Sequence, residues 1–134
     1  MSRVGIALLA VSLMLAACAE TTVEPSITFE GEGCSSSDPS RWPPGPPEID
    51  VANNMGHPTG VVMGTYDEGY GRDDLVAYGS DVSTRPDFID ALEIFEAAPG
   101  SSTLVFDHGA GAYFMVCMPD TNTMVVLEDL VLEE

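Results

Sequence analysis

The chain has 134 residues, enough for one domain, and carries 22 acidic residues against four arginines, for a formal net charge of −18. This balance excludes a nucleic-acid binder, which needs a basic surface to neutralise phosphates, and it excludes a polybasic membrane patch. Hydrophobic residues make up 45% of the chain and occur in clusters, so the chain can build a core and is not disordered throughout.

The N-terminus has the pattern of a targeting signal. A short positive start, Met1 to Arg3, precedes an apolar run, Val4 to Ala17, that is too short to span a bilayer as a mature helix. The run ends in Leu15-Ala16-Ala17-Cys18, which resembles the lipobox of bacterial lipoproteins. The resemblance implies cleavage before Cys18 and diacylation of its thiol, and two acyl chains hold a protein stably to a membrane. The alternative is an ordinary secretory signal with a chance cysteine.

These features divide the chain into three parts. We expect a lipoprotein signal peptide at 1–17, the lipidated Cys18 with a short polar tether at 18–25, and one globular domain at 26–134. The mature protein is then expected in the bacterial cell envelope, lipid-anchored on the extracytoplasmic side of a membrane. Cleavage removes Arg3, so three arginines face 22 acids and the mature net charge is −19.

Two cysteines, Cys34 and Cys117, remain once Cys18 carries lipid. An exported domain with two thiols most simply pairs them in a disulfide. Such a bridge would close a loop of about 84 residues, worth roughly 4–5 kcal/mol in the chain-entropy account. The alternative is that Cys117 is a free thiolate and binds a metal.

The globular part consists mainly of short apolar segments with strand-like alternation. A proline-rich loop follows the first segment and contains Trp42, which we expect to cover one end of the core. Thr84 is a candidate helix cap, with Phe88, Ile89 and Leu92 on one face. The segment 92–98 fits either helix or strand, and we favour a short helix that gives way to a strand. The strands are predicted at 26–32, 48–53, 60–66, 102–107, 110–118 and 123–132.

This pattern predicts an all-β fold, a Greek-key β-sandwich of seven or eight strands with one short helix. A parallel α/β fold is disfavoured because the chain has no repeated helical crossovers.

The order of segments also resembles the cupredoxin-like domains of bacterial lipoproteins, over about 100 residues from Ser26 onward. The resemblance is carried by Ile27-Thr28-Phe29 followed by Cys34, by Ile49 to Asn54 leading to His57, by Pro99-Gly100-Ser101, and by the run Phe106 to Cys117. It implies a plastocyanin-like sandwich, a fold that often holds type 1 copper through two histidines, a cysteine and a weak axial methionine.

The copper ligand set is incomplete in this chain. The resemblance assigns ligand positions to His57, Cys117 and Met124, but no second histidine lies between Met118 and Thr123. His108 precedes Cys117 by nine residues of mostly strand, a separation of roughly 25–30 Å, so the two cannot share a metal. A looser Cu(I) site is a separate idea, because thioethers suit Cu(I). Its candidate ligands are Met55, His57, Met63, Met118 and Met124.

Other chemistry has less support. The chain has no serine-hydrolase elbow, P-loop or dinucleotide fingerprint. The acidic segment Asp67 to Asp74 has carboxylates suited to Ca²⁺ but lacks EF-hand spacing, which favours a solvated loop.

We therefore expect a non-catalytic, membrane-anchored binding module without a cofactor; the alternative is a copper-binding or electron-transfer protein. Its ligand is an unknown protein or small solute, and a partner attracted by net charge would be basic. We hypothesise that the acidity reflects a high-salt environment.

Overall fold

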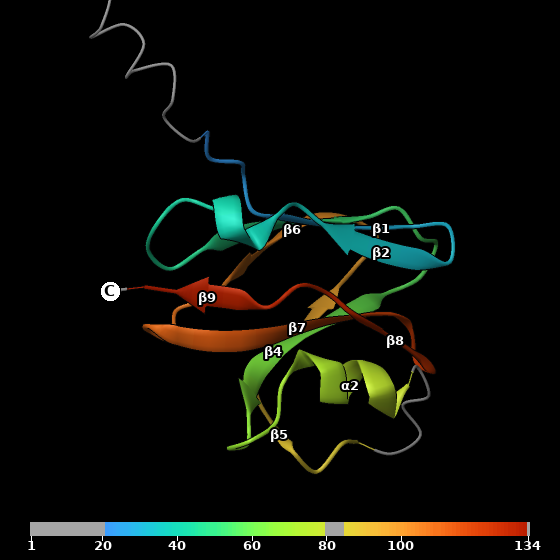
Figure 1. Ribbon diagram of the computed structural model, residues 1–134. Helices are drawn as coiled ribbons and strands as arrows, with labels where there is room; N and C mark the ends of the chain where they lie inside the picture. The colour runs from blue at the N-terminus through green and yellow to red at the C-terminus, as the bar shows by residue number, and fades with distance from the viewer. Residues whose placement is uncertain (1–20, 80–84, 134) are drawn as a thin grey trace, which may run out of the picture.

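The computed structural model describes residues 21–79 and 85–133, which form a sandwich of two β-sheets with one short α-helix (Figure 1). The four-stranded sheet has the order β2-β1-β3-β6, and the five-stranded sheet has the order β5-β4-β7-β8, with β9 paired to β7. The strands of the first sheet are β1 (Ser26–Glu30), β2 (Gly33–Ser36), β3 (Glu48–Asn53) and β6 (Gly100–Val105). Those of the second are β4 (Thr59–Tyr66), β5 (Ile89–Ala97), β7 (Gly111–Asp120), β8 (Thr123–Val126) and β9 (Leu130–Leu132).

The strands form where apolar and polar residues alternate, since successive side chains point to opposite faces. Ile27 and Phe29 of β1 and Ile49 and Val51 of β3 turn inward, and all four are buried. They meet inward-facing side chains of β4 and β7 in one interior cluster. Trp42 joins this cluster and donates its indole N–H to Ser37 Oγ at 2.8 Å, in line with its predicted place over the core.

The outer face of the five-stranded sheet carries a second, smaller cluster. Helix α2 (Arg72–Tyr78) lies beneath this sheet in Figure 1 and inserts the fully buried Leu75 against Phe114, Val116 and Met124. The Arg72 guanidinium fastens the helix to the sheet by donating to the backbone carbonyls of Leu127 and Val126, at 2.8 and 3.2 Å.

The predicted all-β sandwich with one short helix is confirmed, but the helix is not where the sequence placed it. The expected cap, Thr84, lies outside the described residues, and the segment that begins at Ile89 is the nine-residue strand β5. The helix instead begins after Gly71, in the segment expected to be an acidic loop. Asp74 accepts a hydrogen bond from the Gly71 N–H at 2.8 Å, and the first-turn acids Asp73 and Asp74 suit the positive end of a helix.

Two other predicted boundaries change. The proline-rich segment expected to be a loop contains β2 and a 3₁₀ turn, η1 (Pro39–Arg41). The last predicted strand is interrupted between Val126 and Leu130, so β8 and β9 are separate. These pieces bring the strands in the described residues to nine, against the seven or eight expected.

No helix among the described residues is long and apolar enough to cross a membrane.

The glycines of β4 offer a matched test of this packing. The register of β4 against β5 shifts between Met63 and Gly64, and a Cβ at Gly64 would collide with the backbone carbonyl of Asp90. A Cβ at Gly60 would make only ordinary contacts, the nearest at 3.8 Å. We expect Gly64→Ala to lower the free energy of unfolding by about 1–3 kcal/mol, because the paired backbone of β5 at Asp90 would have to move to accommodate the methyl group. Gly60→Ala should be neutral or slightly stabilising. Urea denaturation of both variants measures this, and equal stabilities would contradict the close approach at Gly64.

Candidate functional site

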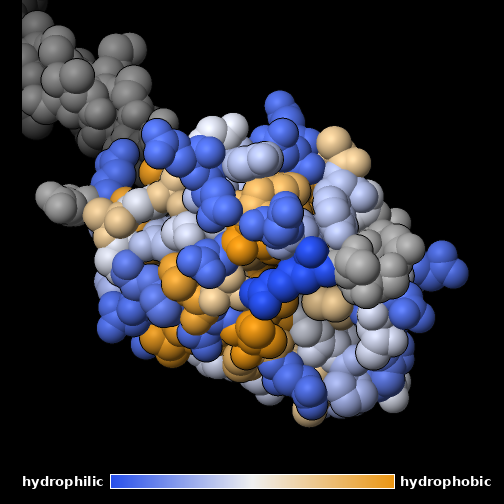
Figure 2. All heavy atoms as spheres, turned by 90° about the horizontal axis from the view of Figure 1, so that it is seen from below, coloured by the Kyte–Doolittle hydropathy of each residue, from blue (hydrophilic) through white to orange (hydrophobic). Residues whose placement is uncertain are grey.

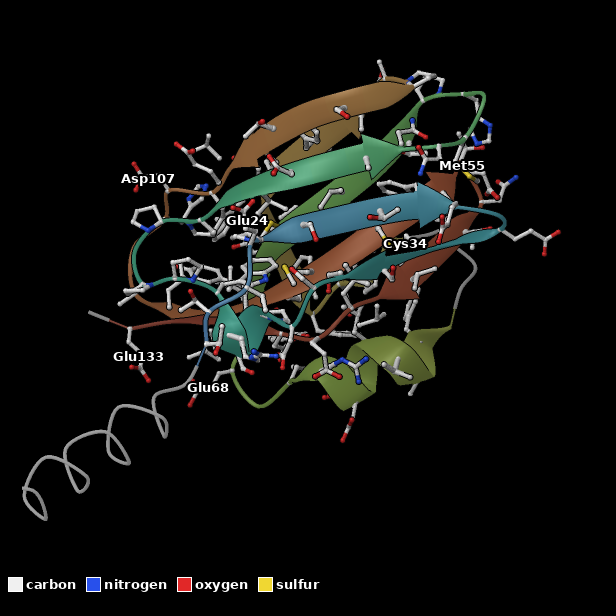
Figure 3. The ribbon with its side chains drawn as sticks, turned by 90° about the horizontal axis from the view of Figure 1, so that it is seen from above. Glu24, Cys34, Met55, Glu68, Asp107 and Glu133 are labelled. Carbon is white, nitrogen blue, oxygen red and sulfur yellow. A yellow bond between two sulfur atoms is a disulfide. The ribbon has the colours of Figure 1, made fainter. Side chains whose placement is uncertain are left out.

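The two sheets are joined by a disulfide between Cys34 on β2 and Cys117 on β7. The Cα atoms are 6.6 Å apart, and Cys117 is fully buried in the interior cluster. Figure 3 looks onto the four-stranded sheet and labels Cys34 on its outermost strand. The predicted pairing is therefore present, and Cys117 is not a free thiolate.

His57 is held near the end of β7 by a network centred on a buried asparagine. Asn53 is 2% exposed and donates to the backbone carbonyls of His57 and Ala97, both at 2.9 Å. Its side-chain oxygen accepts from the Met55 N–H at 2.9 Å. The His57 Nε2 lies 2.8 Å from the Pro119 carbonyl, which can only accept, so this nitrogen carries the proton. These bonds give His57 and Asn53 a structural role.

The structure does not bring His57, Cys117 and Met124 together as one ligand set. Cys117 faces the interior cluster, whereas Met124 belongs to the outer cluster on the other face of the same sheet. The sulfur of Cys117 is also already bonded to Cys34. A metal held by these three side chains would have to lie on both faces of the sheet.

The wider Cu(I) set is divided in the same way. Met55 and Met63 pack with the interior cluster, and Met118 and Met124 pack with the outer one. His108 precedes β7, which runs from it toward Cys117 as the sequence predicted, and its Nε2 lies 3.5 Å from Glu93. Across the described residues, no three His, Cys, Asp or Glu side chains are grouped so that they could hold a metal ion.

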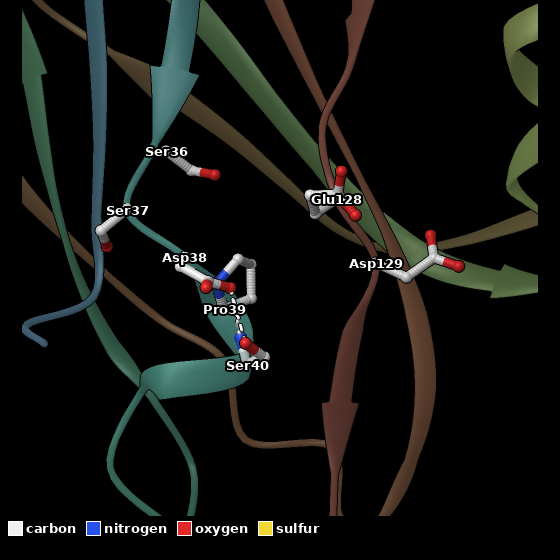
Figure 4. Close-up of a pocket in the computed structure, with 7 residues that line it drawn as sticks. All are labelled: Ser36, Ser37, Asp38, Pro39, Ser40, Glu128 and Asp129. Carbon is white, nitrogen blue, oxygen red and sulfur yellow. Dashed lines mark hydrogen bonds between the residues drawn. The ribbon is translucent and has the colours of Figure 1, made fainter. Parts of the chain in front are cut away.

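One acidic hollow of about 540 Å³ lies between the segment Ser36–Ser40 and the residues Glu128 and Asp129 (Figure 4). Asp38 accepts hydrogen bonds from the hydroxyl and backbone N–H of Ser40, which lower the pKa of its carboxyl group and hold it ionised. Asp129 accepts from the Tyr66 hydroxyl at 2.7 Å. Burial, followed by this hydrogen bond, raises the pKa of Tyr66 above its ordinary value. Asp38 and Asp129 thus serve local structure.

An apolar groove on the outer face of the five-stranded sheet has different chemistry. Its volume is about 270 Å³, and it lies where α2 leaves β4, β5 and β7 uncovered. Figure 2 views the molecule from the α2 side and shows hydrophobic side chains gathered among polar ones on this face. The lining residues are Val62, Arg85, Pro86, Ile89, Ile94, Phe114, Val116, Met118 and Met124.

Sequence reasoning missed this groove, although one signal was present. The run Phe114 to Met118 is apolar at every position, which indicates a strand covered on both faces. The run shows that the outer face of β7 is apolar. It does not show how much of that face α2 covers.

A search of solved structures finds similarity to reduced auracyanin from the photosynthetic bacterium Roseiflexus castenholzii, with 17% sequence identity and a TM-score of 0.40. The match covers 82% of this chain and 98% of that one. No protein-family model and no curated protein matches the sequence.

The disulfide gives a prediction about stability. Reduction of Cys34–Cys117 should lower the free energy of unfolding by about 2–5 kcal/mol, because the unfolded chain regains the freedom of a long loop. Urea denaturation with and without reductant measures the loss. The control is the double variant Cys34→Ala/Cys117→Ala, which should be as weak as the reduced protein and insensitive to reductant. Titratable thiols from both residues in the folded, oxidised protein would contradict the bridge.

Proposed function

We propose that this protein is a lipid-anchored, extracytoplasmic binding module with a cupredoxin-like sandwich in which a disulfide replaces the copper centre. The observation that supports this most directly is the bond between Cys117 and Cys34. The resemblance assigns Cys117 to the copper thiolate, and a disulfide sulfur no longer supplies that ligand. The module is non-catalytic and takes no cofactor.

The proposed anchor would hold the domain close to the membrane. Arg41 donates through Nε and Nη2 to the Thr21 carbonyl at 3.1 and 2.9 Å, and the Val23 N–H donates to the Arg41 carbonyl at 2.8 Å. The chain is thus fastened to η1 only three residues after Cys18, a reach of about 10 Å at full extension. In Figure 1 this end of the chain leaves beside the four-stranded sheet, and α2 lies beneath the other sheet. The α2 face would therefore point away from the bilayer.

Lipidation is tested by Cys18→Ala. The wild-type protein, expressed in a bacterial host, should sediment with membranes, and the mass of its N-terminal peptide should show a diacylglyceryl group on Cys18. The variant should lack this group, because no other thiol follows the apolar run within reach of the processing site. Water-soluble wild-type protein with an unmodified Cys18, or one cleaved elsewhere, would contradict the anchor.

Metal content separates this proposal from a copper-binding or electron-transfer role. We expect the purified lipoprotein, from cells grown with copper, to contain far less than one copper per chain by elemental analysis. Added Cu²⁺ should give no visible copper–thiolate absorption. Cys34→Ala is the control, because it frees the Cys117 thiol but leaves Met124 on the opposite face of the sheet. This variant should also stay colourless. Stoichiometric copper in the wild-type protein would favour the alternative.

A further inference from the structure

The apolar groove on the outer face of the five-stranded sheet combines an apolar lining with a charged residue, a combination that suits a ligand. Its lining is formed by apolar side chains of β4, β5, β7 and β8 and by Pro86, with one charged side chain, Arg85. Ile94, on β5, is 73% exposed, which is unusual for an isoleucine at the centre of a strand. Large exposed apolar patches that are rimmed by polar residues mark binding surfaces.

The groove continues along the sheet toward the end of β7. A second hollow of about 240 Å³ shares Val62, Ile94 and Met118 with it and extends to Glu96 and Asp120. The apolar surface therefore lies between one positive residue and two carboxylates. Each hollow alone falls just below the roughly 300–1,000 Å³ typical of small-molecule sites, and the two together fall within that range.

Arg85 differs from the other two arginines of the described chain. Arg41 and Arg72 both donate to backbone carbonyls and hold the fold together. Arg85 is exposed and has no hydrogen bond or ion pair within residues 21–79 and 85–133, although the chain carries 22 acids. Within those residues the Arg85 guanidinium has no partner, and its planar donors match a carboxylate or phosphate.

We infer that the groove binds a small amphiphile, with an apolar chain or ring along Ile94, Val62 and Met118 and a single anionic head group on Arg85. This inference rests on the proposed binding-module function and names its ligand class. The anchor would leave the groove facing away from the membrane, where such a molecule is accessible. A second copy of the mature chain is a weaker occupant, because its three arginines and 22 acids would bring a further formal charge of −19 to the surface.

Charge selectivity is the sharpest test, since the net charge and the groove predict opposite results. The protein as a whole attracts cations, whereas Arg85 selects an anion. The mature lipoprotein is placed in nanodiscs of zwitterionic phosphatidylcholine and exposed to two photoreactive probes. One is decanoic acid with a diazirine in its chain, and the other is the matching trimethylammonium amphiphile. Mass spectrometry of the digested protein locates the label and separates site binding from partition into lipid.

The carboxylate probe should label peptides of β5 and β7 about three- to fivefold more than the ammonium probe, the size expected of one exposed charge pair. Arg85→Gln should abolish this preference, and Arg85→Lys should retain most of it. Ile94→Glu should reduce labelling by the carboxylate probe at least as much as Arg85→Gln does, because it places a negative charge in the groove. Val105→Glu is the matched control, since Val105 is 52% exposed on β6 of the other sheet. Thermal melts confirm that each variant is folded.

Three outcomes would overturn the inference. The first is equal or stronger labelling by the ammonium probe. The second is carboxylate labelling that Arg85→Gln leaves unchanged. The third is a wild-type dimer by sedimentation that Ile94→Glu dissociates, which would assign the groove to a second copy. Copper content and the lipid on Cys18 are measured on the same preparation. A protein that holds copper or lacks the lipid contradicts the proposed function, and this result is independent of the labelling that tests ligand binding in the groove.

Discussion

Strand β7 is apolar on both faces, and the rest of the structure is arranged around that constraint. Residues Tyr113 to Cys117 are all buried, so each face of the strand needs an apolar layer against it. The four-stranded sheet covers the interior face, and the disulfide between Cys117 and Cys34 joins the two. The outer face is covered by α2 over only part of its length, through Leu75. The Cys34–Cys117 disulfide on the inner face and the exposed groove on the outer face are thus both consequences of a strand that is apolar on both sides.

The sequence was most informative where the pattern was local. The alternation around Ile27, Ile49 and Val51 predicted the strands of the four-stranded sheet, and the cysteine count predicted the bridge. The helix was misplaced because Phe88, Ile89 and Leu92 have helical spacing, while pairing with β4 makes that segment a strand. Long-range pairing of this kind is not encoded in local periodicity.

The predicted ligand residues and the groove could be only partly inferred from the sequence, for a similar reason. The resemblance assigned ligand positions to His57, Cys117 and Met124, but a sequence pattern does not tell which face of a sheet a residue occupies after a turn. The irregular register between β7 and β8 and the turn at Asp120 decide that Met124 joins the outer cluster. The groove combines side chains from four strands with Arg85, so no single segment of the sequence contains it. The net charge of the chain pointed to a basic partner, whereas Arg85, the charged residue that lines the groove, is positive.

The disulfide also bears on when the domain acquires its structure. In the proposed setting the chain is made in a reducing cytoplasm, where Cys34 and Cys117 remain thiols. The domain then lacks a cross-link that joins its two sheets over 83 residues of sequence. A weaker fold is easier to keep unfolded for passage through a membrane, and oxidation afterwards would make the folded state hard to reverse. The bridge would thus couple folding to arrival at the right compartment, in addition to its contribution to stability.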